Sequence, residues 1–285
     1  MTDVSGNPVD GVAPRVYGAS ELGVLALTAP GDVHPRVEYV GGEVFVGLDR
    51  DGAAITRAQA EEAALPFGEL VALVLDSVVV ASKPVDGVLV ADAETTASAV
   101  LVEPAGIAAS DFAGDPVVFA LARERLAVVG ADDEAGIGRV LDLAEALYEE
   151  GGPLVSAHPI VRTDDAWAPF RWNDRFPALR LRIERVLRLF SVRAYEAQGA
   201  ALARPDVHIA DPKVHVRDDG VTLTFAAWPK GTATLLPVVD NVMIADPSGT
   251  VSVTTMDEFL TAAGDAVVRT GLSPLRYFVP GEPPR

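Results

Sequence analysis

Residues 114–152, GDPVVFALARERLAVVGADDEAGIGRVLDLAEALYEEGG, form the most regular unit of the chain. Two apolar, β-branched runs, 116–121 and 126–129, flank a short polar break and predict a hairpin of two buried strands. A helix follows, and it starts at Asp132 or Asp133, because a carboxylate there can cap its free amides and face the positive end of its dipole. The stretch therefore predicts a piece of sheet covered by one helix.

The predicted helix has a single apolar face. Its apolar residues are spaced by three, four and seven positions, which places them on one side of a helix. These residues are Ile137, Val140, Leu141, Ala144, Leu147 and Tyr148. Two glycines and a proline after Glu150 end the helix. We expect the apolar face to pack on the hairpin.

The same order of hairpin and helix recurs twice. Apolar alternation around Gly41-Gly42 predicts a hairpin, and Thr56 with Gln59 matches a capping box for the helix after it. Near the C-terminus, two strands flank 247–249, and Thr255 with Glu258 forms a second capping box before a helix. Units near 37–80, 116–150 and 242–268 thus predict an α+β fold of antiparallel sheets with helices packed on one face.

Further elements complete this outline. The almost wholly apolar stretch 67–80 is either a covered helix or a helix that runs into a strand. We expect a strand at 87–91, a small-residue helix at 93–102, a long helix at 177–202 and a hairpin of 213–217 with 221–227. The sequence predicts a flexible tail over residues 1–30, an α+β domain over 31–172, and a second α+β domain over 173–285 that is a helix followed mainly by strands.

Composition limits the classes of function. The 285 residues are 49% hydrophobic and can bury a sizeable core. A formal net charge of −18 argues against general affinity for nucleic acid or anionic membranes. No cysteine is present, no secretory signal is visible at the N-terminus, and no apolar run reaches the length of a membrane span. We expect a cytoplasmic protein without a membrane segment.

Several stretches between residues 36 and 172 carry a family resemblance. They include ITRAQAEEAALPFGELVALVLDSV (55–78), GDPVVFALARERLAVVG (114–130) and HPIVRTDDAW (158–167). This succession resembles the bacterial DUF1444 family, also called the YtpQ-like or UPF0354 proteins. The resemblance implies an α+β fold and a bacterial cytosolic setting. It implies no activity and no catalytic residues.

The sequence contains no convincing motif for a metal site, a nucleotide site or a catalytic nucleophile. His208 and His215 are seven residues apart across a proline, which fits neither a helical nor a strand metal site even with Asp206 and Asp211 nearby. Gly130–Gly138 follows a strand and opens a helix, but acidic residues occupy the place where a pyrophosphate needs bare amides. The other two histidines are His34 and His158. His158 is interpreted as an edge-loop residue, and Asp49-Arg50-Asp51-Gly52 as an ordinary turn and not part of a calcium loop. No cofactor or metal is predicted.

The sequence contains one unusual cluster of basic residues. Residues 171–204 contain eight arginines and three acids, a local charge of +5 in a chain of −18. The five arginines on the predicted helix are Arg180, Arg182, Arg185, Arg188 and Arg193. They either bind acidic groups of the same chain and join its two halves, or expose a basic face to an acidic partner.

The main hypothesis is a non-catalytic binding or adaptor protein whose partner is another protein. It rests on a large predicted core without a convergent set of reactive side chains. One alternative is an enzyme that uses carboxylates and arginines on a phosphorylated or sugar substrate, with Asp164 and Asp165 near Arg162. The other is anion or nucleic-acid binding through the arginine-rich helix. Homo-oligomerisation is compatible with all three.

Overall fold

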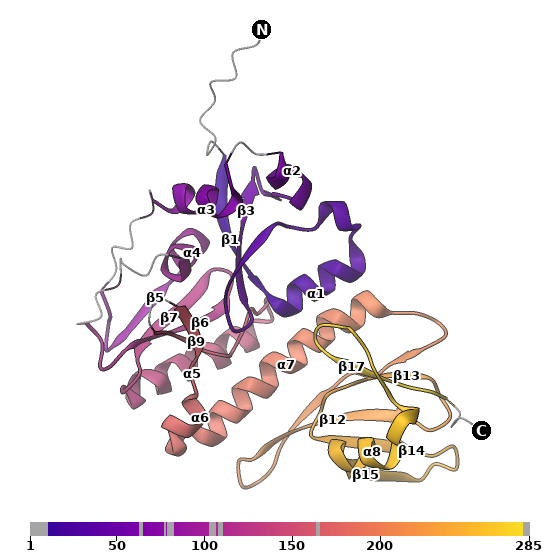
Figure 1. The fold of residues 1–285 in the computed structure, drawn as a ribbon. Helices are drawn as coiled ribbons and strands as arrows, with labels where there is room; N and C mark the ends of the chain where they lie inside the picture. The colour runs from indigo at the N-terminus through magenta and orange to yellow at the C-terminus, as the bar shows by residue number, and fades with distance from the viewer. Residues whose placement is uncertain are drawn as a thin grey trace. The chain divides into compact units, whose positions relative to one another are not determined.

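The structure, a computed structural model, divides the chain into two compact units (Figure 1). The N-terminal unit comprises residues 1–18 and 29–172, and the C-terminal unit comprises residues 19–28 and 173–285. The residues that the structure describes are 11–62, 65–76, 78, 83–102, 107, 111–163 and 166–281. The division at Trp172 lies where the sequence predicts a domain boundary.

The N-terminal unit contains two sheets and four helices within its described residues, and its last residue begins a short fifth helix. Its strands are β1 (Val12–Gly18), β2 (Val37–Gly41), β3 (Val44–Arg50), β4 (Ala53–Ala54), β5 (Val88–Ala91), β6 (Pro116–Ala122), β7 (Arg125–Gly130), β8 (Ile160–Thr163) and β9 (Ala166–Pro169). Its helices are α2 (Arg57–Glu61), α3 (Phe67–Leu75), α4 (Glu94–Val102), α5 (Glu134–Glu150) and the start of α6 (Trp172–Arg175), with a 3-10 turn at Gly31–Val33.

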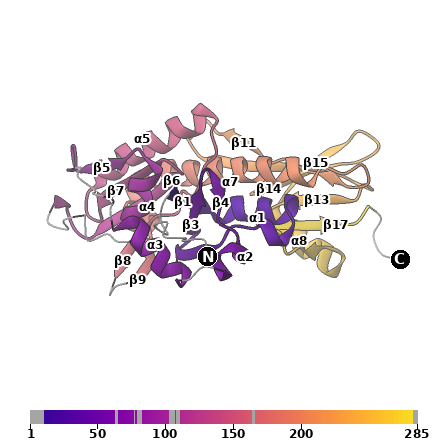
Figure 2. The same ribbon diagram turned by 90° about the horizontal axis from the view of Figure 1, so that it is seen from above.

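The larger sheet has the order β5-β7-β6-β8-β9, and each neighbouring pair is antiparallel. Its central strands β6 and β7 are buried on both faces, because α5 covers one face and α4 the other (Figure 2). Asp133 caps α5 through the Gly136 amide at 2.8 Å, and Gly151 ends it with a φ of 79°. The opening hairpin and its helix are therefore confirmed.

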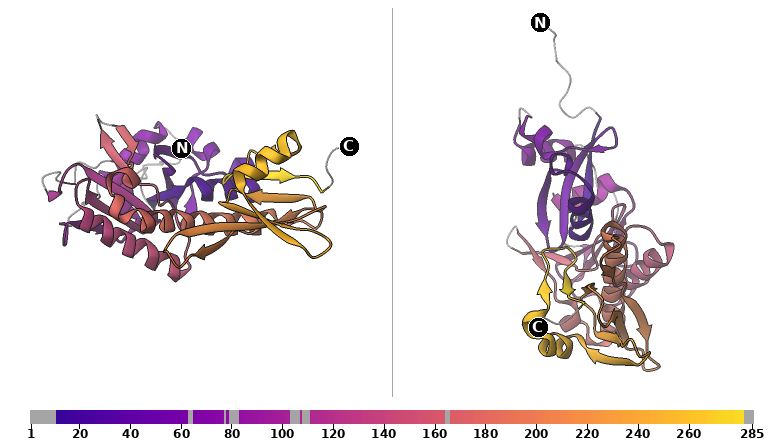
Figure 3. Two further views of the ribbon diagram at one scale, coloured as in Figure 1. Left: turned by 90° about the horizontal axis from the view of Figure 1, so that it is seen from below. Right: turned by 90° about the vertical axis from the view of Figure 1, so that its right-hand side faces the viewer.

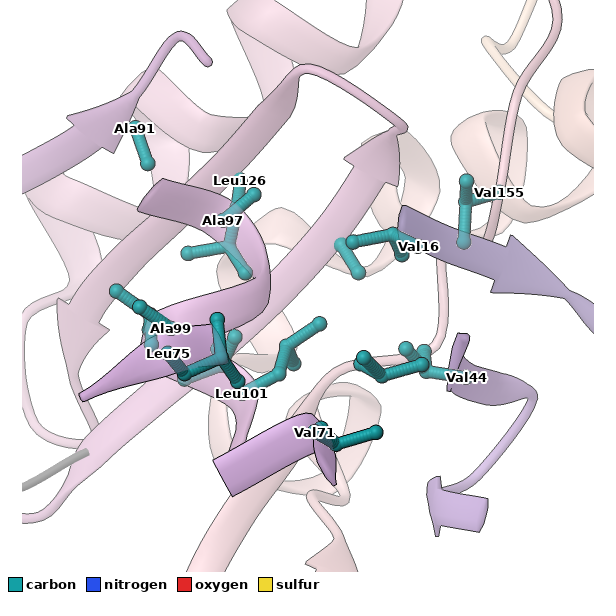
Figure 4. Packing of buried hydrophobic residues seen from close by; sticks show 14 of the residues in the cluster. Val16, Val44, Val71, Leu75, Ala91, Ala97, Ala99, Leu101, Leu126 and Val155 are labelled. Carbon is teal, nitrogen blue, oxygen red and sulfur yellow. The ribbon is translucent and has the colours of Figure 1, made fainter. Parts of the chain in front are cut away.

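The smaller sheet, β1-β3-β2 with β4 beside β3, faces the other side of α4. This helix is enclosed between the two sheets, and Val100 and Leu101 are almost fully buried. Small residues at its centre allow close approach of the strands on both sides. Figure 4 shows the resulting core, in which Val16, Leu101 and Leu126 come from three different elements.

The C-terminal unit combines one long helix with two four-stranded sheets. Its helices are α1 (Ala19–Thr28), α7 (Arg180–Leu202) and α8 (Met256–Ala263), with 3-10 turns at Pro177–Leu179 and Gly264–Ala266. Its strands are β10 (His208–Ile209), β11 (Lys213–Val216), β12 (Thr222–Pro229), β13 (Thr234–Pro237), β14 (Asn241–Ala245), β15 (Val251–Thr255), β16 (Val268–Arg269) and β17 (Arg276–Val279).

The two sheets of this unit have the orders β11-β12-β14-β15 and β10-β13-β17-β16. Ala226 and Val242 from the first sheet meet Leu236 and Val279 from the second, and Phe259 of α8 closes the same core. Figure 3 shows α8 lying against the strands of this unit. The pairs β12–β14 and β10–β13 are parallel, whereas the other pairs of both sheets are antiparallel.

The predicted α+β class is confirmed, as are the hairpins at Gly41-Gly42, 218–220 and 247–249. Both capping boxes are present with the predicted residues. The structure differs in detail, since helices cover both faces of the larger sheet and two strand pairs are parallel. For 67–80, residues 67–75 form helix α3, and residues 77, 79 and 80 lie outside the described part.

The prediction of a flexible tail over residues 1–30 is wrong for residues 12–28. Strand β1 is a core strand in which Val16 and Tyr17 are each 1% exposed. The next ten residues form α1, which lies beside α7 in the C-terminal unit. Gly23 of α1 approaches the Ser273 carbonyl so closely that a Cβ would collide with it. The prediction failed because proline and glycine flank these elements and hide two short apolar patterns.

Candidate functional site

A cavity of about 750 Å³ lies in the C-terminal unit, between α8 and the ends of β12, β14 and β17. Its volume falls within the range of about 300–1,000 Å³ that is typical of ligand pockets. It is lined by Trp228, Lys230, Gly231, Ile244, Asp246, Pro247, Phe259, Ala262, Ala263, Ala266, Val267, Val279, Pro280 and Gly281. Among these side chains only Lys230 and Asp246 carry charge. The cavity is therefore suited to apolar groups.

Two aromatic rings form one wall of the cavity. Trp228 and Phe259 meet edge to face, with ring centroids 5.4 Å apart. The Trp228 indole N–H donates to the Thr232 carbonyl at 3.3 Å, so its polar atom is engaged while its face stays available. Because Phe259 is buried in the core and Trp228 is only partly buried, the pair is anchored on one side and accessible on the other.

The capping box fixes the position of α8 over the cavity. The Thr255 hydroxyl accepts from the Glu258 amide at 3.2 Å, and the Glu258 carboxylate accepts from the Thr255 amide at 3.0 Å. The helix therefore begins at Met256, which buries Met256 and Phe259 and leaves Ala262 exposed at the cavity. The small side chains of Ala262 and Ala263, which line the cavity, keep this space open.

The segment that supplies most of the cavity lining is rich in acids, two of which, Asp240 and Asp246, are paired with Arg188 and Lys230. Between Gly231 and Val268 the chain contains five carboxylates and no lysine, arginine or histidine. At the rim, Lys230 pairs with Asp246 at 3.2 Å. The Ser248 amide and hydroxyl, together with Lys230, hold the pKa of the Asp246 carboxyl below its usual value. The lining therefore offers no carboxyl group with a raised pKa for acid–base chemistry.

A polar cluster in the N-terminal unit gathers residues from distant parts of the sequence. Arg15 of β1 binds Asp49 of β3 at 2.8 Å, and the Tyr17 hydroxyl donates to the same carboxylate at 3.2 Å. Glu94, in the first turn of α4, has one carboxylate oxygen that is buried without a hydrogen-bond partner. Burial raises the pKa of Glu94, although Arg15 and Arg123 oppose the shift.

A second cavity of about 660 Å³ lies in the N-terminal unit, where Arg50, Asp51, Gln59 and Glu62 are among the residues that line it. The adjoining residues 63 and 64 lie outside the described part, so no site is built there. Neither cavity is lined by Arg15, Glu94 or Arg123.

The arginines predicted as a contact surface have different environments on α7. Arg188 makes two bonds of 2.9 Å to the Asp240 carboxylate and contacts the Glu184 carbonyl at 3.1 Å. Arg180 pairs with Glu184 at 2.8 Å on the surface, and Arg193 lies 3.9 Å from Glu196. Arg182 and Arg185 are partly buried and also interact with other groups. Arg188 thus joins two elements of one unit.

The Asp240 carboxylate is the centre of that contact. It also accepts from the amide and the hydroxyl of Thr224, at 2.7 and 2.8 Å. Burial alone would raise the pKa of Asp240, but the bonds from Arg188 and Thr224 outweigh it and lower the pKa. This carboxylate therefore ties α7 to β12.

The other sequence candidates are separate from one another. His208 and His215 lie on different strands, and the His215 ring packs edge to face on Phe225. No three His, Asp or Glu residues in the described ranges come close enough to hold a metal ion. Asp51 and Gly52 form a turn between β3 and β4 with positive φ angles. Asp164 and Asp165 lie outside the described residues, so their relation to Arg162 is not described.

Sequence reasoning missed both the cavity and the Glu94 cluster. Trp228 lies just past the predicted strand 221–227, and Ala262 and Ala263 lie within the last predicted helix, so none of them was singled out. One signal was available, because the segment from Gly231 to Val268 contains acids but no basic residue. For Glu94 no local signal exists, since its partners lie far away in the chain.

Comparison with known proteins found no matching family model, no matching curated protein and no matching solved structure. Across the part of the chain that the structure describes, each helix is too short or too polar to cross a bilayer.

We predict that Arg188→Ala lowers the free energy of unfolding by about 1–2 kcal/mol at neutral pH, since charged hydrogen bonds are lost from a partly exposed pair. Asp240 has a lowered pKa in the folded state, so its contribution is present above its ordinary value of 3.8 and fades as the pH falls through the lowered value. Urea unfolding at several pH values checks this. Arg180→Ala, on the surface of the same helix, should lower the free energy of unfolding much less, because its pair with Glu184 is exposed to solvent. An equal loss for both variants contradicts the assignment.

Glu94→Gln should stabilise the protein at neutral pH, by less than about 1 kcal/mol because the group is half exposed. A raised pKa means that the folded state holds the proton above pH 4.5, so ionisation costs stability as the pH rises through the folded value. The gain should vanish as the pH falls towards 4.5. Thermal unfolding measures it, with the exposed Glu124→Gln as control. A variant less stable than wild type at neutral pH would mean that Arg15 and Arg123 outweigh burial.

Proposed function

We propose that this protein is a non-catalytic binding module that holds apolar side chains of a basic protein segment in the α8 cavity. The observation that carries the proposal is the cavity wall, in which Trp228 and Phe259 present anchored aromatic surface and Lys230 and Asp246 are the only charged groups. Aromatic residues of this kind supply much of the energy at protein interfaces.

Charge supports the choice of a basic partner. The segment from β13 to the end of α8 carries acids without bases, and the whole chain has a net charge of −18. A cationic segment is attracted from a distance by such a field, whereas an acidic segment or nucleic acid is repelled. Once at the surface, its apolar side chains can replace water in the cavity, which provides the affinity.

The rival function is an enzyme that works with carboxylates and arginines. Glu94 favours it, because this carboxyl has a raised pKa and lies near Arg15, Arg123 and Asp49. The binding role is supported better, since neither cavity is lined by Glu94 or by the two arginines. Anion binding through α7 has less support, because Arg188 is engaged with Asp240. The resemblance of 36–172 to the DUF1444 family implies a bacterial cytoplasmic setting, with which the absence of cysteine is compatible.

Calorimetric titration with synthetic peptides tests the proposal. The probe is a peptide with two leucines between pairs of lysines, and two comparison peptides replace either the lysines by glutamates or the leucines by serines. We expect the lysine–leucine peptide to bind at least about tenfold more tightly than both, a difference of ~1.4 kcal/mol. Equal binding of all three, or no binding of any, contradicts the proposal.

Filling the cavity provides the matched control. Ala262→Phe places a ring in the cavity from an exposed helix position, and it should weaken binding of the lysine–leucine peptide by about tenfold. Thr261→Phe adds the same ring at the neighbouring exposed position, which does not line the cavity, and should leave binding unchanged. Unaltered affinity in Ala262→Phe would place the peptide elsewhere on the protein.

A further inference from the structure

Strand β15 forms an open edge of the sheet β11-β12-β14-β15. It pairs with β14 on one side, and Val251 and Val253 are 54% and 56% exposed. Its sequence, Val-Ser-Val-Thr-Thr, contains no charge, no proline and no glycine. Such an edge lacks the features by which proteins normally prevent pairing with a further strand.

The opposite edge of the same sheet is protected. Strand β11 carries Lys213 and His215, and a charged turn with Arg217 and Asp219 follows it. Charged side chains on an edge strand oppose the approach of another strand. The contrast within one sheet indicates that β15, and not β11, is suited to accept a partner strand.

The hydrogen bonds around β15 identify the backbone groups that face outwards. The backbone amide of Asp246 donates to the Thr250 carbonyl at 2.9 Å, and the backbone amide of Met256 donates to the Asp240 carbonyl at 3.0 Å. In an antiparallel ladder, bonded pairs alternate with non-bonded pairs, so the even-numbered residues of β15 bond to β14. The N–H and C=O groups of Val251 and Val253 therefore point away from β14, towards the open edge.

We propose that β15 pairs with β15 of a second copy of this chain, antiparallel and with the two-fold axis at Val253. Each Val253 then donates to the carbonyl of the other Val253, and Val251 lies opposite Thr255 of the second copy. The pairing ends at Thr255, whose amide is already bound to Glu258. A two-fold axis requires a self-complementary strand, and an uncharged strand centred on valine meets that requirement.

The side chains agree with this pairing. Met243 lies opposite Val253 in the β14–β15 ladder, so both are on one face, and Met243 is 36% exposed. Pairing at Val253 brings the valines and methionines of two copies into one continuous apolar strip. The antiparallel arrangement places the two Glu258 carboxylates at opposite ends of the paired strands, which avoids their repulsion. Because each copy has a charge of −18, we expect association to strengthen as salt is added.

Cysteine cross-linking of the full chain tests the register, because the chain has no cysteine of its own. Val253→Cys places two thiols opposite each other about 5.5 Å apart between Cα atoms, a separation that a disulfide spans. Val251→Cys is on the same strand with nearly equal exposure, but its two copies are four residues out of register, roughly 13 Å apart. Mild oxidation should yield covalent dimers of Val253→Cys at least about tenfold faster than of Val251→Cys.

Light scattering of the cysteine-free protein provides the second measurement. The mass should rise towards that of a dimer with protein concentration and with salt. Val253→Glu should remain monomeric, because it places two carboxylates at the axis, while Val216→Glu on the other edge should still dimerise. Equal cross-linking of both cysteine variants, a mixed cross-link between Val253→Cys and Val216→Cys, or a monomer under all conditions would overturn the proposal. Peptide binding to the α8 cavity is measured separately and does not depend on it.

Discussion

The C-terminal unit depends on the hydrogen bonds of one buried guanidinium group, that of Arg276. Its side chain is 0% exposed, and the negative charge of Asp211 acts on it only as a weaker influence than burial. It donates to the Gln198 side chain at 2.6 Å and to the carbonyls of Ala210, Leu235 and Tyr195 at 2.7, 3.1 and 3.1 Å. Removal from water lowers the pKa of Arg276. A buried charge is tolerated only when its donors are satisfied, so these acceptors must stay in place.

The acceptors of Arg276 belong to elements that are otherwise separate. They lie on α7, on β13 and just after β10, while Arg276 itself begins β17. Two more residues of α7 secure the chain before β17, because the Tyr195 hydroxyl donates to the Leu275 carbonyl at 2.6 Å and the Gln198 amide donates to the Pro274 carbonyl at 2.7 Å. The register of β13 with β17 and the position of Val279 at the cavity follow from this network.

Local signals in the sequence were sufficient for much of the fold. Capping residues such as Asp133 and Thr255 mark helix starts because their chemistry acts over three residues, and glycine-containing turns mark hairpins for the same reason. Long-range pairing was not predictable. Nothing near Arg276 in the sequence indicates that it is buried, and α1 joins the C-terminal unit through contacts with α7 that lie more than a hundred residues away. The cavity arises from three strand ends and a helix, which no single segment encodes.

The sharpest measurement is hydrogen exchange of the β13 and β17 amides in Arg276→Lys. Lysine keeps the positive charge but lacks the planar guanidinium group, so it cannot bond to all four acceptors of Arg276 at once. Some of these buried oxygens then lose their hydrogen-bond donor. The account predicts exchange faster by about a hundredfold or more, as expected for a loss of roughly 3 kcal/mol. Arg269→Lys, the same change at an exposed position of the neighbouring strand, should leave exchange unaltered. Equal exchange in the two variants would contradict the central role of Arg276.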